Sequence, residues 1–365
     1  MRGAGATLST LLLAAWAGCA SALWGGGLDA WQAEKPPRLR IAASPYPNHL
    51  LHILPTNEGL GEHLYRPRIS TLGFEPSSET GRGHFYTRRG GFLDLAHIRR
   101  TIDFAGYLHY RVSESLRAGE SHFSFESIDR TSYHCHIRYP KFWSGLPPGE
   151  RESMIEEIAL RAAAEGAFDF NNWREVLTWY DFHNVPGLRE RGSAFSYEDV
   201  PSHGLGVQVA LDALQAEGLG FDEAVTRELA ASLDRLGRVS EEDYRRAMDL
   251  VSGRWWGKKT CLKRHLDLGL DDGFVDPWLV PGLFPEDPKA ARFPAPRSRW
   301  GEVRGYDCRG MVVLECEPRP RRDEILRRIL PPGATRVRPS RDFPALIARI
   351  EKEARRELGP DATRP

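Results

Sequence analysis

The sequence predicts an α+β fold that is predominantly helical, with a helical core, a small β-hairpin and a smaller C-terminal strand-and-helix unit. Apolar residues recur every three or four positions in long stretches between residues 90 and 257, which is typical of helices that bury one face. Alternation of apolar and polar residues is clearest at residues 121–139 and indicates the hairpin. Prolines are frequent beyond residue 258 and favour an irregular connection.

Four segments follow from this composition. Residues 1–22 have the layout of a signal peptide, and residues 23–83 form an irregular lead-in that prolines and glycines interrupt often. We expect residues 84–257 to form the mainly helical core domain. Residues 258–365 are predicted to be a proline-rich connection followed by the small α+β C-terminal unit.

The first 22 residues predict export. Arg2 precedes a short apolar run, and Ala20-Ser21-Ala22 supplies the small residues of a cleavage site. The run is too short for a stable membrane span, and no later segment is long and apolar enough to be one. Ala17-Gly18-Cys19 also resembles the end of a bacterial lipoprotein signal. We therefore expect a periplasmic or extracellular protein, with lipid anchoring through Cys19 as the alternative.

The charge balance indicates the kind of partner. The 50 Lys and Arg residues equal the 50 Asp and Glu residues, so no overall field attracts nucleic acid, and we expect no nucleic-acid partner. An exported chain instead meets envelope components or cell-wall ligands. Four tryptophans either line a groove for glycans or, as is more common for large aromatic residues, belong to the core: Trp173, Trp179, Trp255 and Trp256.

The most regular stretch of the first half is Gly90–Arg111. The Gly90-Gly91 pair is expected to open a helix directly, with the apolar side chains from Phe92 onward on one face. Asp94 then lies in the first turn, where exposed backbone N–H groups favour a carboxylate. His97 follows three residues later and can reach Asp94.

The other elements follow in chain order. A strand is expected at Leu39–Ala43 and another at His84–Arg89, and the hairpin places His134 and His136 on one face. The long apolar pattern of Glu150–Phe182 predicts one helix or two joined near Gly166. The further predicted elements are a helix that Ser196 caps and that runs to Leu214, a helical hairpin at Phe221–Gly253 with Ser240 as N-cap, a strand at Met311–Pro318, and helices at Asp323–Leu330 and Phe343–Leu358.

Four cysteines remain after the signal segment: Cys135, Cys261, Cys308 and Cys316. An even count in an oxidising compartment permits two disulfides. Cys308 and Cys316 are the expected pair because they bracket a turn and a strand. The alternative is that all four are buried thiols.

Three ordered motifs resemble a known family. GGFLDLAH, then W-x-E-x-x-T-W from Trp173, then S-x-F-S-x-E-D from Ser193, are similar to the exported bacterial proteins of domain of unknown function 4056. The resemblance extends from about His84 to the C-terminal strands and implies no established activity. In that family a His often precedes the Glu of the second motif, where this chain has Arg174, and an Asn often stands at the position of His203.

The same motifs contain the candidate site. A catalytic zinc ion needs three protein ligands and an open position, and a nearby carboxylate can act as general base. Glu175 lies among aromatic and aliphatic residues and is the candidate base, with His97, Asp199 and His203 as metal ligands. Because no H-E-x-x-H signature is present, the alternative is a structural network of satisfied polar groups.

Three further patterns carry weaker signals. His134 and His136 could share a metal, but no third ligand is evident, and a solvent-facing pair is the alternative. Three serines next to His203 invite a nucleophile hypothesis, yet no G-x-S-x-G elbow supports it and helix capping explains them: Ser193, Ser196 and Ser202. Gly90-Gly91 either binds an anion or forms a plain turn.

Two functions follow. The first is an exported bacterial envelope protein of unknown biochemical activity, such as a structural or binding component. The second is a metal-assisted, zinc-type hydrolase acting on an envelope substrate. They differ in whether Glu175, His97 and the Asp199/His203 face converge on an open cleft.

Overall fold

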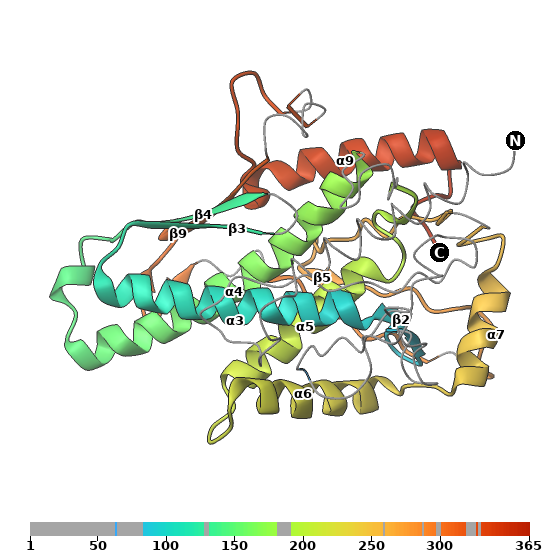
Figure 1. The fold of residues 1–365 in the computed structure, drawn as a ribbon, viewed down its shortest axis with the longest axis horizontal. Coiled ribbons are helices and arrows are strands. Elements are labelled where there is room, and N and C mark those ends of the chain that lie inside the picture. The colour runs from blue at the N-terminus through green and yellow to red at the C-terminus, as the bar shows by residue number, and fades with distance from the viewer. Residues whose placement is uncertain are drawn as a thin grey trace, which may run out of the picture.

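The computed structural model describes residues 63, 83–127, 131–180, 191–257, 260–286, 288–296, 301–318, 326–327 and 330–365. Helices dominate these residues and small antiparallel strand pairs accompany them, so the expected α+β, predominantly helical fold is confirmed (Figure 1). The signal segment with Cys19, the strand at residues 39–43 and most of the helix at residues 323–330 lie outside the described residues.

Three helices form the centre of the molecule. They are α3 (Leu95–Ala118), α4 (Pro148–Trp179) and α5 (Asp199–Leu214), and each packs against the other two. In Figure 1, α3 and α4 run side by side and α5 lies against both near the middle of the picture. Their inward faces are apolar and almost fully buried, which is the main source of folding free energy.

The start of α3 differs from the expectation. Gly91–Asp94 is strand β2, which pairs with β1 (His84–Thr87), and the helix begins only at Leu95. Gly91 has a φ of +65°, and a Cβ there would lie 2.2 Å from the carbonyl oxygen of Trp278, so only glycine fits this turn. The glycine pair therefore forms a β-hairpin turn, and the hypothesis of an anion site at a helix start is wrong.

The other central helices also refine the prediction. α4 is one continuous helix of 32 residues that passes through Gly166 without a break. α5 begins at Asp199, so Ser196 is not its N-cap. The Asp199 side chain nevertheless accepts a hydrogen bond from the backbone N–H of Ser196 (2.7 Å), because the two still face each other across a tight turn.

A helical hairpin follows as expected. It consists of α6 (Phe221–Leu236) and α7 (Glu241–Val251), which line the lower and right edges of Figure 1. The Ser240 hydroxyl accepts a hydrogen bond from the backbone N–H of Asp243 (3.1 Å), so the predicted N-cap of α7 is confirmed.

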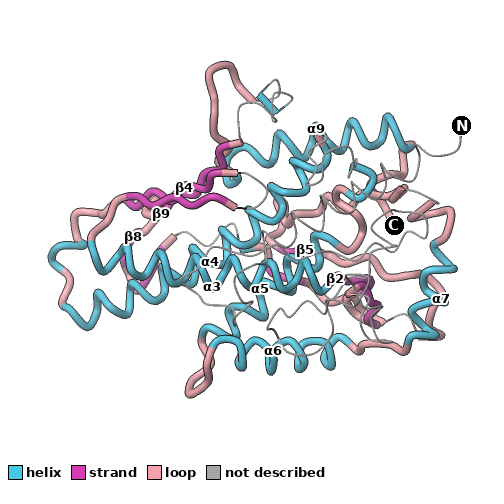
Figure 2. Tube along the Cα trace, viewed as in Figure 1, coloured by secondary structure: helices cyan, strands magenta, loops and turns pink. Residues whose placement is uncertain are grey.

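The hairpin at residues 121–139 is confirmed and gains a third strand. β3 (His122–Glu126) pairs with β4 (Ser132–Ile137), and β4 pairs on its other side with β9 (Val312–Glu317). Figure 2 shows these strands as one sheet above the ends of α3 and α4. The C-terminal strand thus lies in the same sheet as the hairpin, a pairing that spacing along the chain cannot reveal.

The remaining elements are short apart from the last helix. α9 (Pro339–Leu358) begins four residues before the predicted start at Phe343, with Pro339 in its first turn, where a missing N–H costs nothing. The short strands form two further pairs: β5 (Phe274–Val275) with β6 (Phe293–Pro294), and β7 (Glu302–Val303) with β8 (Tyr306–Asp307). Single turns of 3-10 helix occur at Trp143–Gly145 (η1) and Arg191–Ser193 (η2).

The structure contains no disulfide between Cys308 and Cys316, which corrects the expectation. The backbone N–H of Met311 donates to the carbonyl of Cys308 (3.0 Å), so Cys308 lies at the start of β9. All four cysteines are buried, as the alternative expected.

The tryptophans do not line a glycan groove. Trp173, Trp179 and Trp255 are fully buried, and the indole N–H groups of the first two donate to Thr131 and Glu353. These three belong to the core, which is the alternative that the sequence left open, whereas Trp256 is half-buried and its indole N–H donates to the carbonyl of Met248. Among the described residues, no helix has the length and apolar character needed to cross a bilayer.

Candidate functional site

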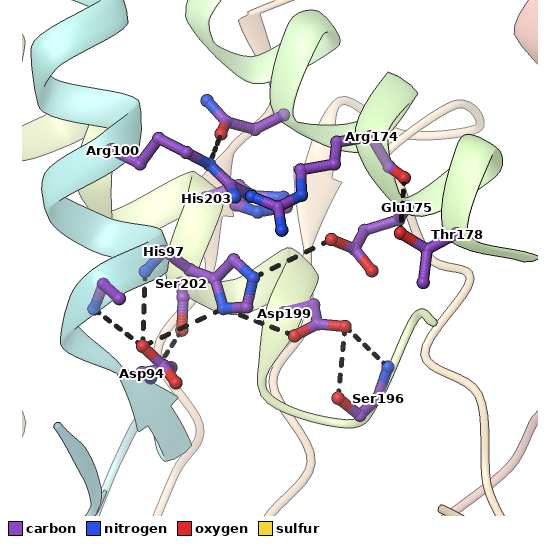
Figure 3. Close-up of polar contacts among 12 residues, drawn as sticks. Asp94, His97, Arg100, Arg174, Glu175, Thr178, Ser196, Asp199, Ser202 and His203 are labelled. Atoms are coloured by element: carbon purple, nitrogen blue, oxygen red, sulfur yellow. Dashed lines mark hydrogen bonds and ion pairs between the residues drawn. The ribbon is translucent and has the colours of Figure 1, made fainter. Parts of the chain in front are cut away.

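The three central helices bring the predicted residues together. His97 comes from the first turn of α3, Glu175 from the last turns of α4, and Asp199 and His203 from the start of α5 (Figure 3). One ligand atom each of His97, Glu175 and His203 lie within 4.8 Å of one another. Residues more than 100 positions apart in sequence thus form one cluster.

The His97 ring lies between carboxylates. Its Nε2 is 3.7 Å from Glu175 Oε1, and its Nδ1 is 3.4 Å from Asp199 Oδ1 and 3.9 Å from Asp94 Oδ1 (Figure 3). Asp94 is the N-cap of α3 and accepts hydrogen bonds from the backbone N–H groups of Ala96 and His97. The cap therefore fixes the helix turn that carries His97.

A hydrogen-bond chain sets the tautomer of His203. The Asn172 amide donates from Nδ2 to the carbonyl of Phe168 (2.9 Å), which directs its Oδ1 toward His203 Nδ1 at 3.1 Å. Because Oδ1 only accepts, Nδ1 carries the proton and Nε2 presents a lone pair. Nε2 is buried and has no hydrogen-bond partner among the described residues. A buried lone pair of this kind needs a proton donor or a metal ion.

Both histidines are neutral. Burial lowers the pKa of His97 and of His203 well below the usual range, and the positive charges of Arg100 and Arg174 lower both further. Neutral imidazole is the form that binds metal ions. The fixed positive charge beside the cluster therefore comes from the two arginines, which Figure 3 shows on the His203 side of the site.

The carboxyl groups are crowded and buried. Burial raises the pKa of Glu175, while Arg100 and Arg174 act in the opposite direction, and Glu175 Oε2 accepts a hydrogen bond from the backbone N–H of Phe195 (3.2 Å). Burial and the negative charges of Glu175 and Glu198 raise the pKa of Asp199 well above its usual range. Such a set of acids holds protons unless a cation neutralises it.

Glu198 offers a way to measure how this crowding of carboxyl groups affects stability. Burial raises its pKa from 4.5 to about 7, against hydrogen bonding from Ser196. The folded chain therefore keeps a proton that the unfolded chain loses, so Glu198 lowers stability as the pH rises through that window. We expect Glu198→Gln to gain about 1–3 kcal/mol relative to the parent protein between about pH 4.5 and pH 8.

Urea denaturation of chelator-treated protein at both pH values measures this gain, with the exposed Glu223→Gln as the control variant. An equal effect of Glu198→Gln at both pH values would contradict the assignment. Chelation matters because a bound cation would itself change the protonation of neighbouring carboxyl groups.

The site is nearly closed. His203 is 0% exposed, Asp199 2% and Glu175 4%, whereas His97 reaches 9%. Access to the cluster in the described part of the chain is therefore on the His97 side. The residues predicted to be together do converge, but they do so in a buried setting.

Sequence reasoning missed three contributors: Asn172, Arg100 and Glu198. Asn172 precedes Glu175 by three residues and so lies on the same face of α4, a spacing that could have indicated it. Arg100 lies in α3 one turn after His97 and donates to Asn171 Oδ1 (2.5 Å). Asp103 Oδ1 lies 2.9 Å from His63 Nε2.

The serines have structural roles. The Ser202 hydroxyl donates to the carbonyl of Glu198 (2.6 Å) and accepts from the backbone N–H of Asp94 (2.9 Å), which ties α5 to β2. The Ser196 hydroxyl lies within hydrogen-bond distance of Glu198 and Asp199. Neither hydroxyl caps α5, whose N-cap is Glu198 without a side-chain cap hydrogen bond, so the capping explanation is wrong for these two serines.

The chain belongs to a family of proteins of unknown function (DUF4056). The model of that family matches residues 37–268, which include the three central helices and every residue of the cluster. Comparisons with curated proteins and with solved structures found no match. The family fits the resemblance seen in the sequence motifs and assigns no activity.

Proposed function

We propose that this DUF4056 protein binds a divalent transition metal ion through His97, Glu175 and His203 and uses it for hydrolysis. The observation that carries the proposal is the buried lone pair of His203 Nε2, held in place by Asn172 and facing two further donor groups. Two imidazoles and one carboxylate form a donor set that zinc and related ions prefer.

The donor set also fits a catalytic centre. Three protein ligands leave a coordination position for water, and a bound metal ion lowers the pKa of that water and polarises a carbonyl or phosphoryl oxygen. Arg100 and Arg174 act on both histidines electrostatically and can attract the negative charge that develops during hydrolysis. The positive charges of these arginines favour a substrate group that is anionic or strongly polarised.

The geometry favours a division of roles that differs from the one expected from the sequence. Glu175 faces His97 Nε2 and belongs with the ligands, whereas Asp199 faces the opposite ring nitrogen, Nδ1. A carboxylate in that place accepts the Nδ1 proton and orients the imidazole, as in carboxylate–histidine–metal arrangements. We assign Glu175 as a ligand and Asp199 as the residue that positions His97.

The proposal includes export. The layout of residues 1–22 supports secretion, and the substrate would then belong to the bacterial envelope. Cleavage after Ala22 gives a soluble protein, and lipidation of Cys19 gives an anchored one. Mass spectrometry of the mature N-terminus distinguishes them, since a diacylglyceryl group on Cys19 would contradict soluble export.

The burial of the cluster favours a second candidate function. With His203 0% exposed, the metal ion could serve structure alone, in a non-catalytic envelope component. The two candidates share the metal ion and differ in whether a substrate reaches it.

Elemental analysis and hydrolysis assays test both. We expect the untagged protein to carry one zinc, manganese or related ion per chain, and to hydrolyse a member of an ester, amide and phosphoester panel only while metal is bound. Metal without any hydrolysis, together with a large loss of thermal stability on chelation, would favour the structural candidate. Absence of metal after incubation with zinc, with normal folding, would contradict both.

A further inference from the structure

Two arginines lie beside the buried cluster, on its His203 side. Arg100 comes from α3, one turn after His97, and Arg174 comes from α4, directly before Glu175. Figure 3 shows both arginine side chains extending from the two helices toward His203. The positive charges of both arginines lower the pKa of His97 and of His203, so both guanidinium groups are near both rings. Two guanidinium groups therefore lie next to the candidate metal ligands.

The Arg100 guanidinium is held in place by a neutral group. Its Nε donates to Asn171 Oδ1 (2.5 Å), and the Asn171 amide in turn donates from Nδ2 to the backbone carbonyl of Ala167 (2.8 Å). Arg100 is 4% exposed, so packing also fixes its position. An amide oxygen accepts a hydrogen bond without neutralising the guanidinium, so the positive charge of Arg100 still acts on the cluster.

Arg174 has a different environment. It is partly exposed, and within the described part of the chain its side chain makes no hydrogen bond and no ion pair. The bond at this residue joins its backbone carbonyl to the Thr178 hydroxyl (2.9 Å). By contrast, Arg161 of the same helix pairs with Glu157. A partly exposed guanidinium without a carboxylate beside it is suited to recognise an anionic ligand.

The pair of guanidinium groups favours a phosphate over a carboxylate. Each guanidinium presents its N–H donors as a planar fork, and the two oxygens of one carboxylate already satisfy one fork. A phosphate monoester has three terminal oxygens and a charge of about −1.5 to −2 at pH 7. It can therefore accept hydrogen bonds from two forks and still present lone pairs to a metal ion. Two arginines next to a candidate metal centre match that number of oxygens and that charge.

On the basis of the hydrolytic function proposed above, we propose that Arg100 and Arg174 bind the phosphate group of the substrate, and that this substrate is a phosphate monoester. In its hydrolysis the oxygen of a water molecule forms a bond to phosphorus, while the bond between phosphorus and the alcohol oxygen breaks. The alcohol oxygen keeps the electron pair of that bond and takes one proton of the water, and the other proton stays on the inorganic phosphate. The two arginines stabilise the charge on the phosphoryl oxygens.

The test is calorimetric titration of the full chain with inorganic phosphate, in a metal-free form and in a zinc-loaded form. Arg174→Gln removes charge-assisted hydrogen bonds, so it should weaken phosphate binding by about tenfold or more. Arg174→Lys keeps the charge but loses the planar fork, so its affinity should lie between those of the parent and Arg174→Gln. The zinc content of both variants should equal that of the parent protein, because Arg174 is not a metal ligand.

The matched control is Arg161→Gln in the same helix. Arg161 Nη2 lies 2.5 Å from Glu157 Oε1, so its charge is already paired, and its removal should leave phosphate affinity unchanged. Acetate serves as the competing anion and should bind about tenfold more weakly than phosphate, or less.

Three results would overturn the proposal: no phosphate binding in either form, phosphate affinity that Arg174→Gln does not change, or acetate binding as tight as that of phosphate. The outcomes also separate this proposal from the one on which it rests. Zinc uptake without phosphate binding would contradict the phosphate site alone. Phosphate binding through Arg174 in a chain that takes up no zinc would support the phosphate site and contradict the metal-dependent hydrolysis.

Discussion

His203→Ala should abolish metal binding at the buried cluster. The substitution removes the donor whose tautomer Asn172 fixes, and the other two donors, His97 and Glu175, cannot by themselves form a three-ligand centre. We expect the metal content at this centre to fall from one ion per chain to none after gel filtration. If the protein is a hydrolase, its metal-dependent activity should disappear together with the metal ion.

The control is His265→Ala. His265 is also 0% exposed and burial also lowers its pKa, but its Nε2 lies 2.9 Å from the carbonyl oxygen of Asp276, and the residue supplies no ligand atom to the cluster. Both variants lose a buried imidazole, so both lose stability, and only His203→Ala should lose metal. Equal metal content in the two variants would contradict the assignment of His203 as a ligand.

Asn172→Leu should produce a smaller loss with the same origin. Without the amide oxygen, His203 can place its proton on either nitrogen, and a metal ion competes with the wrong tautomer. We expect metal affinity to fall by about 10–100-fold, the usual range for an outer partner of a ligand histidine. A titration against a chromophoric chelator measures this change, and unchanged affinity would show that Asn172 does not set the tautomer.

Gly206→Ala should strongly destabilise the fold. A Cβ at Gly206 of α5 would lie 2.6 Å from the carbonyl oxygen of Ile98 and 2.7 Å from Thr101 Cβ, both in α3. The backbone cannot yield as a side chain can, so the two helices must separate. We expect a loss of about 1–3 kcal/mol in the free energy of unfolding, measured by urea denaturation.

The same substitution at Gly149 is the control. Gly149 lies in the first turn of α4, and a Cβ there would meet nothing within 4 Å. Alanine has the higher helix propensity, so Gly149→Ala should gain up to about 1 kcal/mol. A gain of similar size for Gly206→Ala would show that α3 and α5 do not require this close approach.

Gly206 also connects stability to the site. It lies three residues after His203 in α5, and Ile98 directly follows His97 in α3. Separating the helices at this point would move the two imidazoles apart. Gly206→Ala is therefore expected to weaken metal binding even under conditions in which the protein remains folded.

Local sequence patterns were sufficient to predict the type of most elements and several of their ends. The periodicity around Met154 and Trp173 predicted α4, the alternation around Tyr133 predicted β4 with His134 and His136 on its outer face, and Ser240 marked the start of α7. These features depend on neighbours within about four residues, so they can be read from the chain. The family resemblance rested on motifs of the same local kind.

Local patterns were wrong where a distant segment decided the backbone. The apolar spacing from Phe92 suited a helix, yet β1 pairs with these residues and Gly91 needs a positive φ under Trp278, so β2 forms instead. Cys308 and Cys316 suited a disulfide by their spacing, but both are buried free thiols in the structure. Propensity is a weak preference that long-range pairing overrides.

The convergence of the candidate ligands depends on tertiary packing. The sequence named His97, Glu175, Asp199 and His203, but their distances follow from the packing of α3, α4 and α5, as does the Asn172 bond that fixes the His203 tautomer. Strand pairing likewise places His122 beside His134 across the hairpin, and no spacing along the chain predicts that register. A metal site depends on angstrom-scale distances between side chains, and those distances are set by long-range packing rather than by neighbours in sequence.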